Sequence, residues 1–253
     1  MMDIILLTSR TLKYYLRNPV ETIPGIAISV FFLLVYNAGL SDVSKLPGFT
    51  GSYLAFILPV SIISAAINGA GLAGQSLVRD IQTGYYTKLL LSPAKRLAII
   101  WGAMLAGAIV LIIEAILILG LALAMGLTSK TGLAGYGVII LLTFIWGMAF
   151  SGFSVFVALK TRSANATQAS TFVFFPLIFL SATFVPKAFI TSHWLKVAAT
   201  YNPTTYAFDA MRSVLMVGWQ TKPLLLGFGI LLAFATVTGV LSLVQANRST
   251  RLG

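Results

Sequence analysis

With 253 residues, of which 58% are hydrophobic and only 9% are charged, and a mean hydropathy of +0.95, the chain lies far outside the composition of soluble proteins. Its formal net charge of +11 would suggest nucleic-acid binding in a soluble protein, but in so apolar a chain it fits the Lys and Arg of cytoplasmic loops. The chain has no cysteine, which excludes disulfides, thiolate metal sites and a cysteine nucleophile, and we expect no nucleic-acid partner.

The first predicted element is an amphipathic helix. Its charged residues fall on one face of a helical projection and apolar residues take the rest. These charged residues are Asp3, Arg10, Lys13 and Arg17. Such a helix lies in the membrane interface rather than crossing it, and Pro19 ends it because the residue before a proline avoids the α region. Residues 1–19 are therefore predicted to form an interfacial helix, which is either a surface anchor or a contact with a cytoplasmic partner.

Six apolar stretches are each long enough to cross a bilayer, which takes roughly 20 mostly apolar residues. They lie at 23–40, 53–74, 97–125, 136–159, 167–184 and 224–244. We predict an all-α polytopic membrane protein with a single domain over residues 1–253 and six transmembrane helices. A cytoplasmic N-terminus places eleven of the 17 Lys and Arg residues inside, and this bias favours both termini on the cytoplasmic side.

Residues 76–96, between the second and third stretches, are too polar to span a membrane and too apolar to form a freely solvated loop. Gly84 interrupts the helical continuity of this loop, and Pro93 stands where a following helix could begin. Apolar residues such as Tyr85 and Leu91 need a partner surface or the interface. The pattern predicts a short helix that docks at the cytoplasmic face.

Residues 69–74 read G-A-G-L-A-G, a literal match to the dinucleotide-binding pattern. That pattern requires a preceding strand and a βαβ unit, whereas here it closes an apolar helix, so helix packing or a kink is favoured. The chain also has no Gly-Lys dipeptide and therefore no phosphate-binding loop, so any ATPase that drives it must be a separate polypeptide. A lone His193 cannot form a zinc site or a Ser-His relay, and no metal or catalytic site is predicted.

Glu114 is the only acidic residue well inside an apolar stretch. Ionisable groups inside a membrane are costly and are functional candidates by default. A proton relay is poorly supported, because no other carboxylate or histidine lies at matching depth. A role in a substrate pathway stays open.

The segment 185–223, between the fifth and sixth stretches, has two halves, neither of them long and apolar enough to span a membrane. Helical periodicity runs over 205–217, where Asp209 and Arg212, three residues apart, are close enough to pair. We predict two short re-entrant helices that dip into the outer leaflet, because backbone at membrane depth must stay hydrogen-bonded within the protein.

Four segments occur in one order along the chain. They are Arg17-Asn18-Pro19; Arg79-Asp80-Ile81-Gln82-Thr83-Gly84 followed by Leu89-Leu90-Leu91-Ser92-Pro93; Phe175-Pro176-Leu177 through Phe184-Val185-Pro186; and Trp194-Leu195 followed by Asn202-Pro203-Thr204-Thr205-Tyr206 and Asp209-Ala210-Met211-Arg212. Together, and over nearly the whole chain, they resemble the membrane subunit of type-2 ABC exporters, specifically the daunorubicin-resistance-like permeases.

The resemblance implies a mechanism. Two identical or homologous permeases would form a twelve-helix unit above two separate ATP-binding subunits, which would hold ATP and Mg²⁺ while this chain holds no cofactor. The 76–96 loop would be a coupling helix seated in a groove on the ATPase. ATP-driven closure of the ATPase pair would tilt the helices and push an amphipathic drug, lipid or glycolipid outward.

The resemblance also assigns roles to residues. The coupling residues would be Arg79, Asp80, Thr83, Gly84, Lys88 and Pro93. The outer re-entrant helices that cap the exit would be shaped by Asn202, Pro203, Tyr206, Asp209 and Arg212, although local helix capping and an ion pair explain this second set equally well. An apolar pathway could be lined by Phe172, Phe174 and Phe175, although lipid-facing phenylalanines look the same in sequence.

Two other classes of function are open. An intramembrane lipid-modifying enzyme would need converging carboxylates, histidines or a metal site, and six acids and one histidine argue against it. An ion-coupled transporter with internal repeats would need intramembrane charges in both halves, and Glu114 has no counterpart. The leading prediction is a multi-pass permease subunit, not itself an enzyme, in a prokaryotic plasma membrane.

Overall fold

The computed structural model describes residues 2–47, 49, 51–93, 95–181, 183–184, 186 and 190–249, and every regular element within them is helical. The long helices are α2 (Ile23–Leu40), α3 (Tyr53–Gln82), α5 (Arg96–Ala124), α6 (Gly132–Thr161) and α11 (Thr221–Ser249). The shorter ones are α1 (Met2–Arg17), α4 (Tyr85–Leu91), α7 (Ala164–Thr171), α8 (Phe174–Phe179), α9 (His193–Tyr201) and α10 (Pro203–Arg212). Single turns of 3₁₀- or π-helix are η1 (Pro19–Glu21), η2 (Ser41–Lys45) and η4 (Ser213–Val217).

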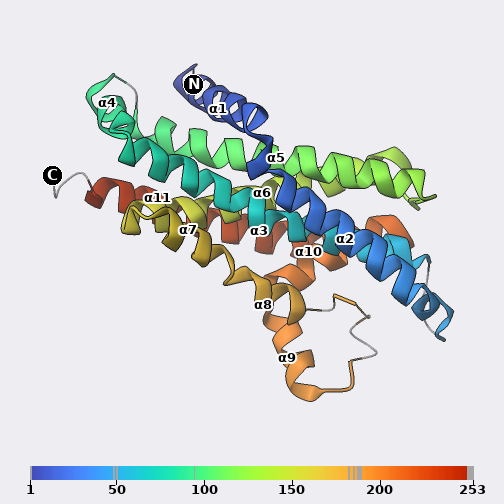
Figure 1. The fold of residues 1–253 in the computed structure, drawn as a ribbon. Helices are drawn as coiled ribbons and strands as arrows, with labels where there is room; N and C mark the ends of the chain where they lie inside the picture. The colour runs from blue at the N-terminus through green and yellow to red at the C-terminus, as the bar shows by residue number, and fades with distance from the viewer. Residues whose placement is uncertain are drawn as a thin grey trace.

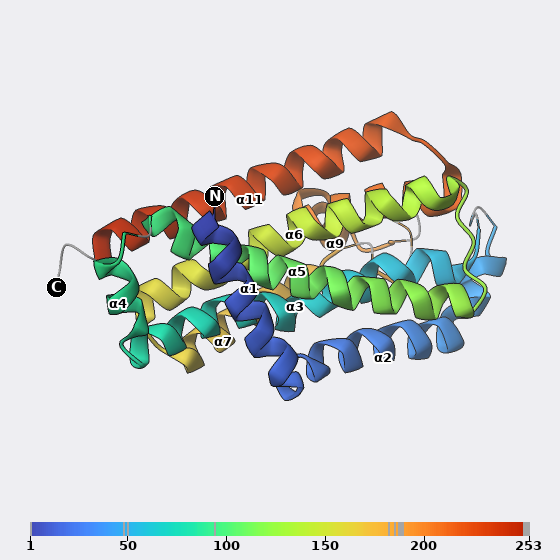
Figure 2. The same cartoon turned by 90° about the horizontal axis from the view of Figure 1, so that it is seen from above.

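Among the described residues, five helices are long and apolar enough to cross a membrane, namely α2, α3, α5, α6 and α11. They lie side by side in an elongated bundle (Figures 1 and 2). Helix α2 has 18 residues and α3 has 30. At about 1.5 Å per residue, α2 matches the roughly 30 Å hydrocarbon core of a bilayer, whereas α3 exceeds it by about 15 Å. The multi-pass architecture predicted from the sequence is confirmed.

Helices α3 and α6 form the centre of the bundle. They pack on each other, α5 packs on both, α2 covers α3, and α11 covers α6. The outer helices α2 and α11 expose large apolar side chains such as Phe31 and Leu225, as helices in contact with lipid do. The bundle therefore has a protein-lined centre and a lipid-compatible surface.

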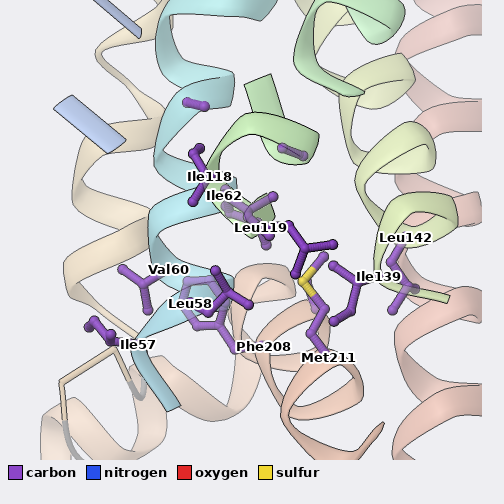
Figure 3. Close-up of a cluster of buried hydrophobic side chains, with 14 of the residues drawn as sticks. Ile57, Leu58, Val60, Ile62, Ile118, Leu119, Ile139, Leu142, Phe208 and Met211 are labelled. Atoms are coloured by element: carbon purple, nitrogen blue, oxygen red, sulfur yellow. The ribbon is translucent and has the colours of Figure 1, made fainter. Parts of the chain in front are cut away.

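The largest hydrophobic cluster joins the short helix α10 to the long helices (Figure 3). Phe208 and Met211 of α10 reach Leu58 on α3 and Leu119 on α5, and all four side chains are buried. Dispersion and area burial at this cluster hold α10 inside the bundle rather than on its surface. This packing fixes the position of the polar residues that α10 carries.

Glycines at helix contacts allow the centre of the bundle to pack closely. A Cβ on Gly74 of α3 would collide with Ser154 of α6 and with Thr167 of α7, and a Cβ on Gly107 of α5 would collide with Ser151 of α6. The pattern at 69–74 lies within continuous α3, so it serves helix packing and not a nucleotide-binding turn.

The fifth apolar stretch does not form the single membrane-length helix predicted over 167–184. It forms α7 and α8, which are separated by a turn at Phe172 and Val173. Pro176 has no N–H to donate to the Phe172 carbonyl, and that carbonyl accepts the Phe175 N–H instead at 3.1 Å. A proline inside a helix breaks the i to i−4 ladder in this way, and the described residues therefore contain five membrane-length helices rather than six.

The other short segments agree with their sequence patterns. The predicted amphipathic helix is α1, and it ends at Arg17, directly before Asn18 and Pro19. A short helix, α4, stands in the 76–96 loop, and the two short helices predicted in the outer segment are α9 and α10. The backbone forms a π-turn over 213–217, where regular helical periodicity is predicted. Val185, residues 187–189 and Arg251 lie outside the described residues.

The start of α1 and the end of α11 lie toward the end of the bundle that carries α4, and the α5–α6 connection lies at the other end (Figure 1). Below we call these the α4 end and the far end. An even number of crossings is needed to bring both termini to the same end, while the membrane-length helices number five within the described residues. The chain between α6 and α11 must therefore return from the α4 end to the far end. Figure 1 shows α7 and α8 covering the first part of this path, from the α4 end toward the middle of the bundle.

Candidate functional site

The turn between α3 and α4 is built by Thr83 and Gly84. The Thr83 N–H and Oγ1 each donate to the Arg79 carbonyl at 2.9 Å and so close the last turn of α3. Gly84 follows with φ of 72°, a left-handed conformation in which a side chain is strained. This combination ends α3 and redirects the chain into α4.

Helix α4 has one buried face and one exposed face. Tyr86 packs into a cluster with Val78 of α3 and Ile99 of α5, which fixes the helix to the bundle. Lys88 and Pro93 are exposed, and Leu91 is 84% exposed. Lys88 and Leu91 are three residues apart and therefore lie on the same side of α4.

Arg79 and Asp80 each form an ion pair with a residue near the start of the chain. Asp80 forms an ion pair with Arg10 of α1, whose guanidinium lies 4.2 Å from the centre of the Tyr85 ring. Arg79 lies 3.3 Å from Glu21 of η1. These contacts connect α1, η1, α3 and α4 into one unit at the α4 end.

Tyr14 completes this network. The Arg79 guanidinium lies 3.5 Å from the centre of the Tyr14 ring, and the Tyr14 hydroxyl donates to Glu21 Oε1 at 2.7 Å. The hydrogen bond to Glu21 raises the pKa of Tyr14, because deprotonation would remove the donor. Arg10, Tyr14 and Glu21 were not predicted as partners of the 76–96 loop. Arg10 and Asp80 are 70 residues apart in the sequence, and Glu21 and Arg79 are 58 apart. No local sequence pattern predicts contacts between residues so distant.

Asn202 and Pro203 start α10. Asn202 Oδ1 accepts the Thr204 N–H at 3.0 Å, and its Nδ2 donates to the Leu177 carbonyl at 2.5 Å. Pro203 occupies the first helical position, where its missing N–H costs nothing. These two residues cap α10 and tie it to α8, which is the structural role that the sequence left open.

Arg212 anchors the other end of α10. Its side chain is buried; Nε donates to the Phe56 carbonyl of α3 at 2.9 Å and Nη2 donates to the Thr183 carbonyl at 2.9 Å. The guanidinium also lies 3.5 Å from the centre of the Phe56 ring. An arginine in this position fastens α10 to α3 by charge-assisted hydrogen bonds.

A cavity of about 480 Å³ opens beside Arg212, and Asp209 and Tyr206 line it as well. The Tyr206 hydroxyl donates to the Thr200 carbonyl at 2.7 Å, which joins α10 to α9. The structure thus brings three of the five predicted outer residues to one cavity, while Asn202 and Pro203 act at the start of the helix. Direct pairing of Asp209 with Arg212 stays a prediction.

Glu114 is buried in α5, with an exposed fraction of 2%. Within the described part of the chain neither of its carboxylate oxygens has a hydrogen-bond partner. Its Oε2 would lie 3.4 Å from a Cβ on Gly69, so the missing side chain at Gly69 leaves room for the carboxylate against α3.

The phenylalanines predicted to line a pathway are separated from Glu114. Phe172 and Phe175 are 60% and 44% exposed at the turn between α7 and α8, whereas Phe174 is buried 3.9 Å from Phe150, measured between ring centres. Glu114 borders an apolar cavity of about 200 Å³ between α1, α2 and α5, and neither Phe172 nor Phe175 lines it. Within the single chain, therefore, the predicted pathway residues do not form one site.

Comparison with known proteins gives consistent matches. The family model described as ABC-2 type transporter matches residues 2–216. The "Probable doxorubicin resistance ABC transporter permease protein DrrC" of Mycobacterium tuberculosis is 26% identical over 223 residues, which cover 87% of this chain and 79% of the relative. The "Putative transport permease ycf38" of Cyanophora paradoxa is 24% identical over 215 residues, which cover 83% of this chain and 73% of the relative.

Proposed function

The chain belongs to the ABC-2 type transporter family, and from that premise we propose that it is the permease subunit of an ATP-driven exporter. Membership makes it the membrane subunit of an ABC transporter, not an ATPase. The direction of transport, the cargo and the assembly are the proposal. The cargo is an amphipathic drug, lipid or glycolipid, which moves out of the cytoplasm or the inner leaflet.

The observation that carries the proposal is α4. It is a short helix at the tip of the bundle, fixed on one side by Tyr86 and exposing Lys88 and Leu91 on the other. A separate ABC ATP-binding subunit, which holds ATP and Mg²⁺, would seat this exposed face in a groove. Arg79 and Asp80, in the last turn of α3, form ion pairs with Glu21 and Arg10, and the Arg10 guanidinium also lies over the ring of Tyr85 in α4.

The working assembly contains two permeases, identical or homologous, and two ATPases. In it, α7 and α8 form the fifth crossing, which is supported by the position of both termini at the α4 end (Figure 1). Helices α9 and α10 are the re-entrant helices that cap the exit, with the cavity at Asp209 and Arg212 on the exit side. The excess of Lys and Arg at the α4 end supports cytoplasmic termini in a prokaryotic plasma membrane.

The test is gentle affinity purification from native membranes, followed by mass spectrometry and measurement of stoichiometry. We expect an ATP-binding-cassette protein at about one copy per permease. Lys88→Glu should lose this partner, because it reverses a charge on the exposed face of α4. Lys222→Glu, at the far end, is the matched control and should keep it. A pure oligomer without an ATPase, under conditions that preserve other ABC complexes, would contradict the proposal.

A further inference from the structure

A cavity of about 300 Å³ lies between α1 and the last turns of α3. Figure 2 shows α1 crossing the long helices before the chain turns into α2. Four of the residues that line the cavity are basic, and no acidic residue is among the lining residues that the structure describes. The basic residues are Arg10, Lys13 and Arg17 of α1 and Arg79 of α3.

The three basic residues of α1 form a row. They are three and four residues apart and therefore lie on one face of the helix, where like charges repel each other. A row of this kind on an isolated amphipathic helix is ordinarily a solvated face. Here Arg79 adds a fourth positive charge from a different helix across a cavity, and this arrangement concentrates positive potential where an anion fits.

The chain neutralises only part of this charge. Arg10 and Arg79 form the ion pairs described above, yet 39% and 34% of their side-chain surfaces stay exposed, so a further anion can reach them. Lys13 and Arg17 are exposed and form no ion pair with a described residue. Two of the four positive charges are therefore open to a ligand.

The surroundings of Arg17 indicate where such a ligand comes from. Leu16 precedes it in the sequence and Val20 follows three residues later, and these two side chains are 76% and 78% exposed. Large apolar side chains so exposed at the end of an amphipathic helix contact lipid when the helix lies in a membrane interface. The cavity at Arg17 is thus at the boundary between lipid chains and headgroups, which is the level of the lipid phosphates.

We infer that this cavity binds the phosphate group of an acidic phospholipid from the leaflet in which α1 lies. Lys13 and Arg17 recognise the charge, because both offer charged N–H donors and phosphate oxygens are strong acceptors. The acyl chains extend past Leu16 and Val20. A choline phospholipid is disfavoured, since its ammonium brings another positive charge to a cationic cavity. This binding goes beyond the proposed function and does not depend on it.

The test is native mass spectrometry of the purified full chain in detergent. The chain is mixed with equal amounts of phosphatidylglycerol and phosphatidylcholine that carry the same acyl chains, and the first lipid retained on each chain is counted. We expect phosphatidylglycerol to be retained about tenfold more often, a preference within the reach of two basic residues near a membrane surface.

Three double variants locate the preference. Lys13→Gln with Arg17→Gln should abolish it, whereas Lys13→Arg with Arg17→Lys should keep it because both charges remain. Lys95→Gln with Lys160→Gln is the matched control, which removes two exposed lysines outside the cavity and should leave the preference unchanged. All of these side chains are exposed, so the fold should tolerate the substitutions.

Inorganic phosphate distinguishes a lipid from a free ion. It carries the same charged oxygens without acyl chains, so an excess of it should not displace phosphatidylglycerol from the unaltered chain. Displacement would assign the cavity to free phosphate and overturn the lipid as its source.

Equal retention of the two lipids by the unaltered chain would overturn the inference, and so would a preference that survives in Lys13→Gln with Arg17→Gln. A preference that falls equally in the control would show that total charge decides, which overturns it too. Equal retention together with loss of the ATPase in the glutamine variant would assign the basic row to an acidic surface of that protein instead. A chain that keeps the preference but recovers no ATPase contradicts the proposed function alone.

Discussion

Gly84 is the residue on which the turn between α3 and α4 depends. Its φ of 72° lies in the left-handed region, and a Cβ there would meet no atom within 4 Å, so a side chain would act through the backbone alone. We expect Gly84→Ala to cost about 1 kcal/mol and to misdirect α4, reducing recovery of the ATPase. The amount of ATPase that co-purifies with the variant measures this recovery.

The matched control is Gly120→Ala, at another glycine with open space around it but inside α5. Alanine is favoured over glycine within a helix, so this variant should retain the ATPase. If both variants retain the ATPase equally, the left-handed turn does not matter for docking.

Arg212 gives a prediction about stability. Arg212→Ala removes the donors to the Phe56 and Thr183 carbonyls and opens a hole at the buried guanidinium. We expect a loss of about 2–3 kcal/mol, because buried acceptors are left unpaired. The apparent midpoint of thermal unfolding in nanodiscs would report it, with the exposed Arg248→Ala as control. Equal midpoints for the two variants would contradict the anchoring role of Arg212.

At the residue scale, the sequence could indicate which residues matter but not what they bind. Asn202 and Pro203 were recognisable because a cap and a first-turn proline are local patterns. The partners of Arg79 and Asp80 were not, because Glu21 and Arg10 come from a distant segment. Glu114 was found by its chemistry alone, while its packing against Gly69 depends on how α5 meets α3, which no local pattern sets.

At the scale of elements, the ion pair between Arg10 and Asp80 joins α1 to α3. It is partly exposed, and such pairs contribute about 0.5–1 kcal/mol. Asp80→Arg alone should lower the unfolding midpoint and the recovery of the ATPase, and Arg10→Asp in addition should restore both. Restored stability without restored docking would show instead that Asp80 contacts the ATPase itself.

The five membrane-length helices were predictable because length and apolarity are sufficient signals for a span. The fifth stretch was not, since its mean hydropathy concealed Pro176 and the polar residues of α7, such as Gln168 and Ser170. An apolar composition predicts that a segment avoids water. It does not predict whether the i to i−4 backbone hydrogen bonds continue through the whole segment.

The orientation of the whole molecule is open to a direct measurement, because the chain has no native cysteine. Lys130 and Lys160 are exposed and lie near opposite ends of α6. In intact cells, a membrane-impermeant maleimide should label Lys130→Cys and should reach Lys160→Cys only after permeabilisation. The reverse pattern would place the termini outside, and equal labelling would contradict a spanning α6.

Helix α3 joins the two candidate surfaces of the molecule. Near one end, before α4 begins, Arg79 forms an ion pair with Glu21, and near the other end the Phe56 carbonyl accepts a hydrogen bond from Arg212. If α3 moves as a rod of about 35 Å between these points, a rotation of about 5° shifts one end by about 3 Å relative to the other. The helix then works as a lever: a small displacement imposed at α4 arrives at the far cavity as a movement wide enough to separate a pair of touching side chains.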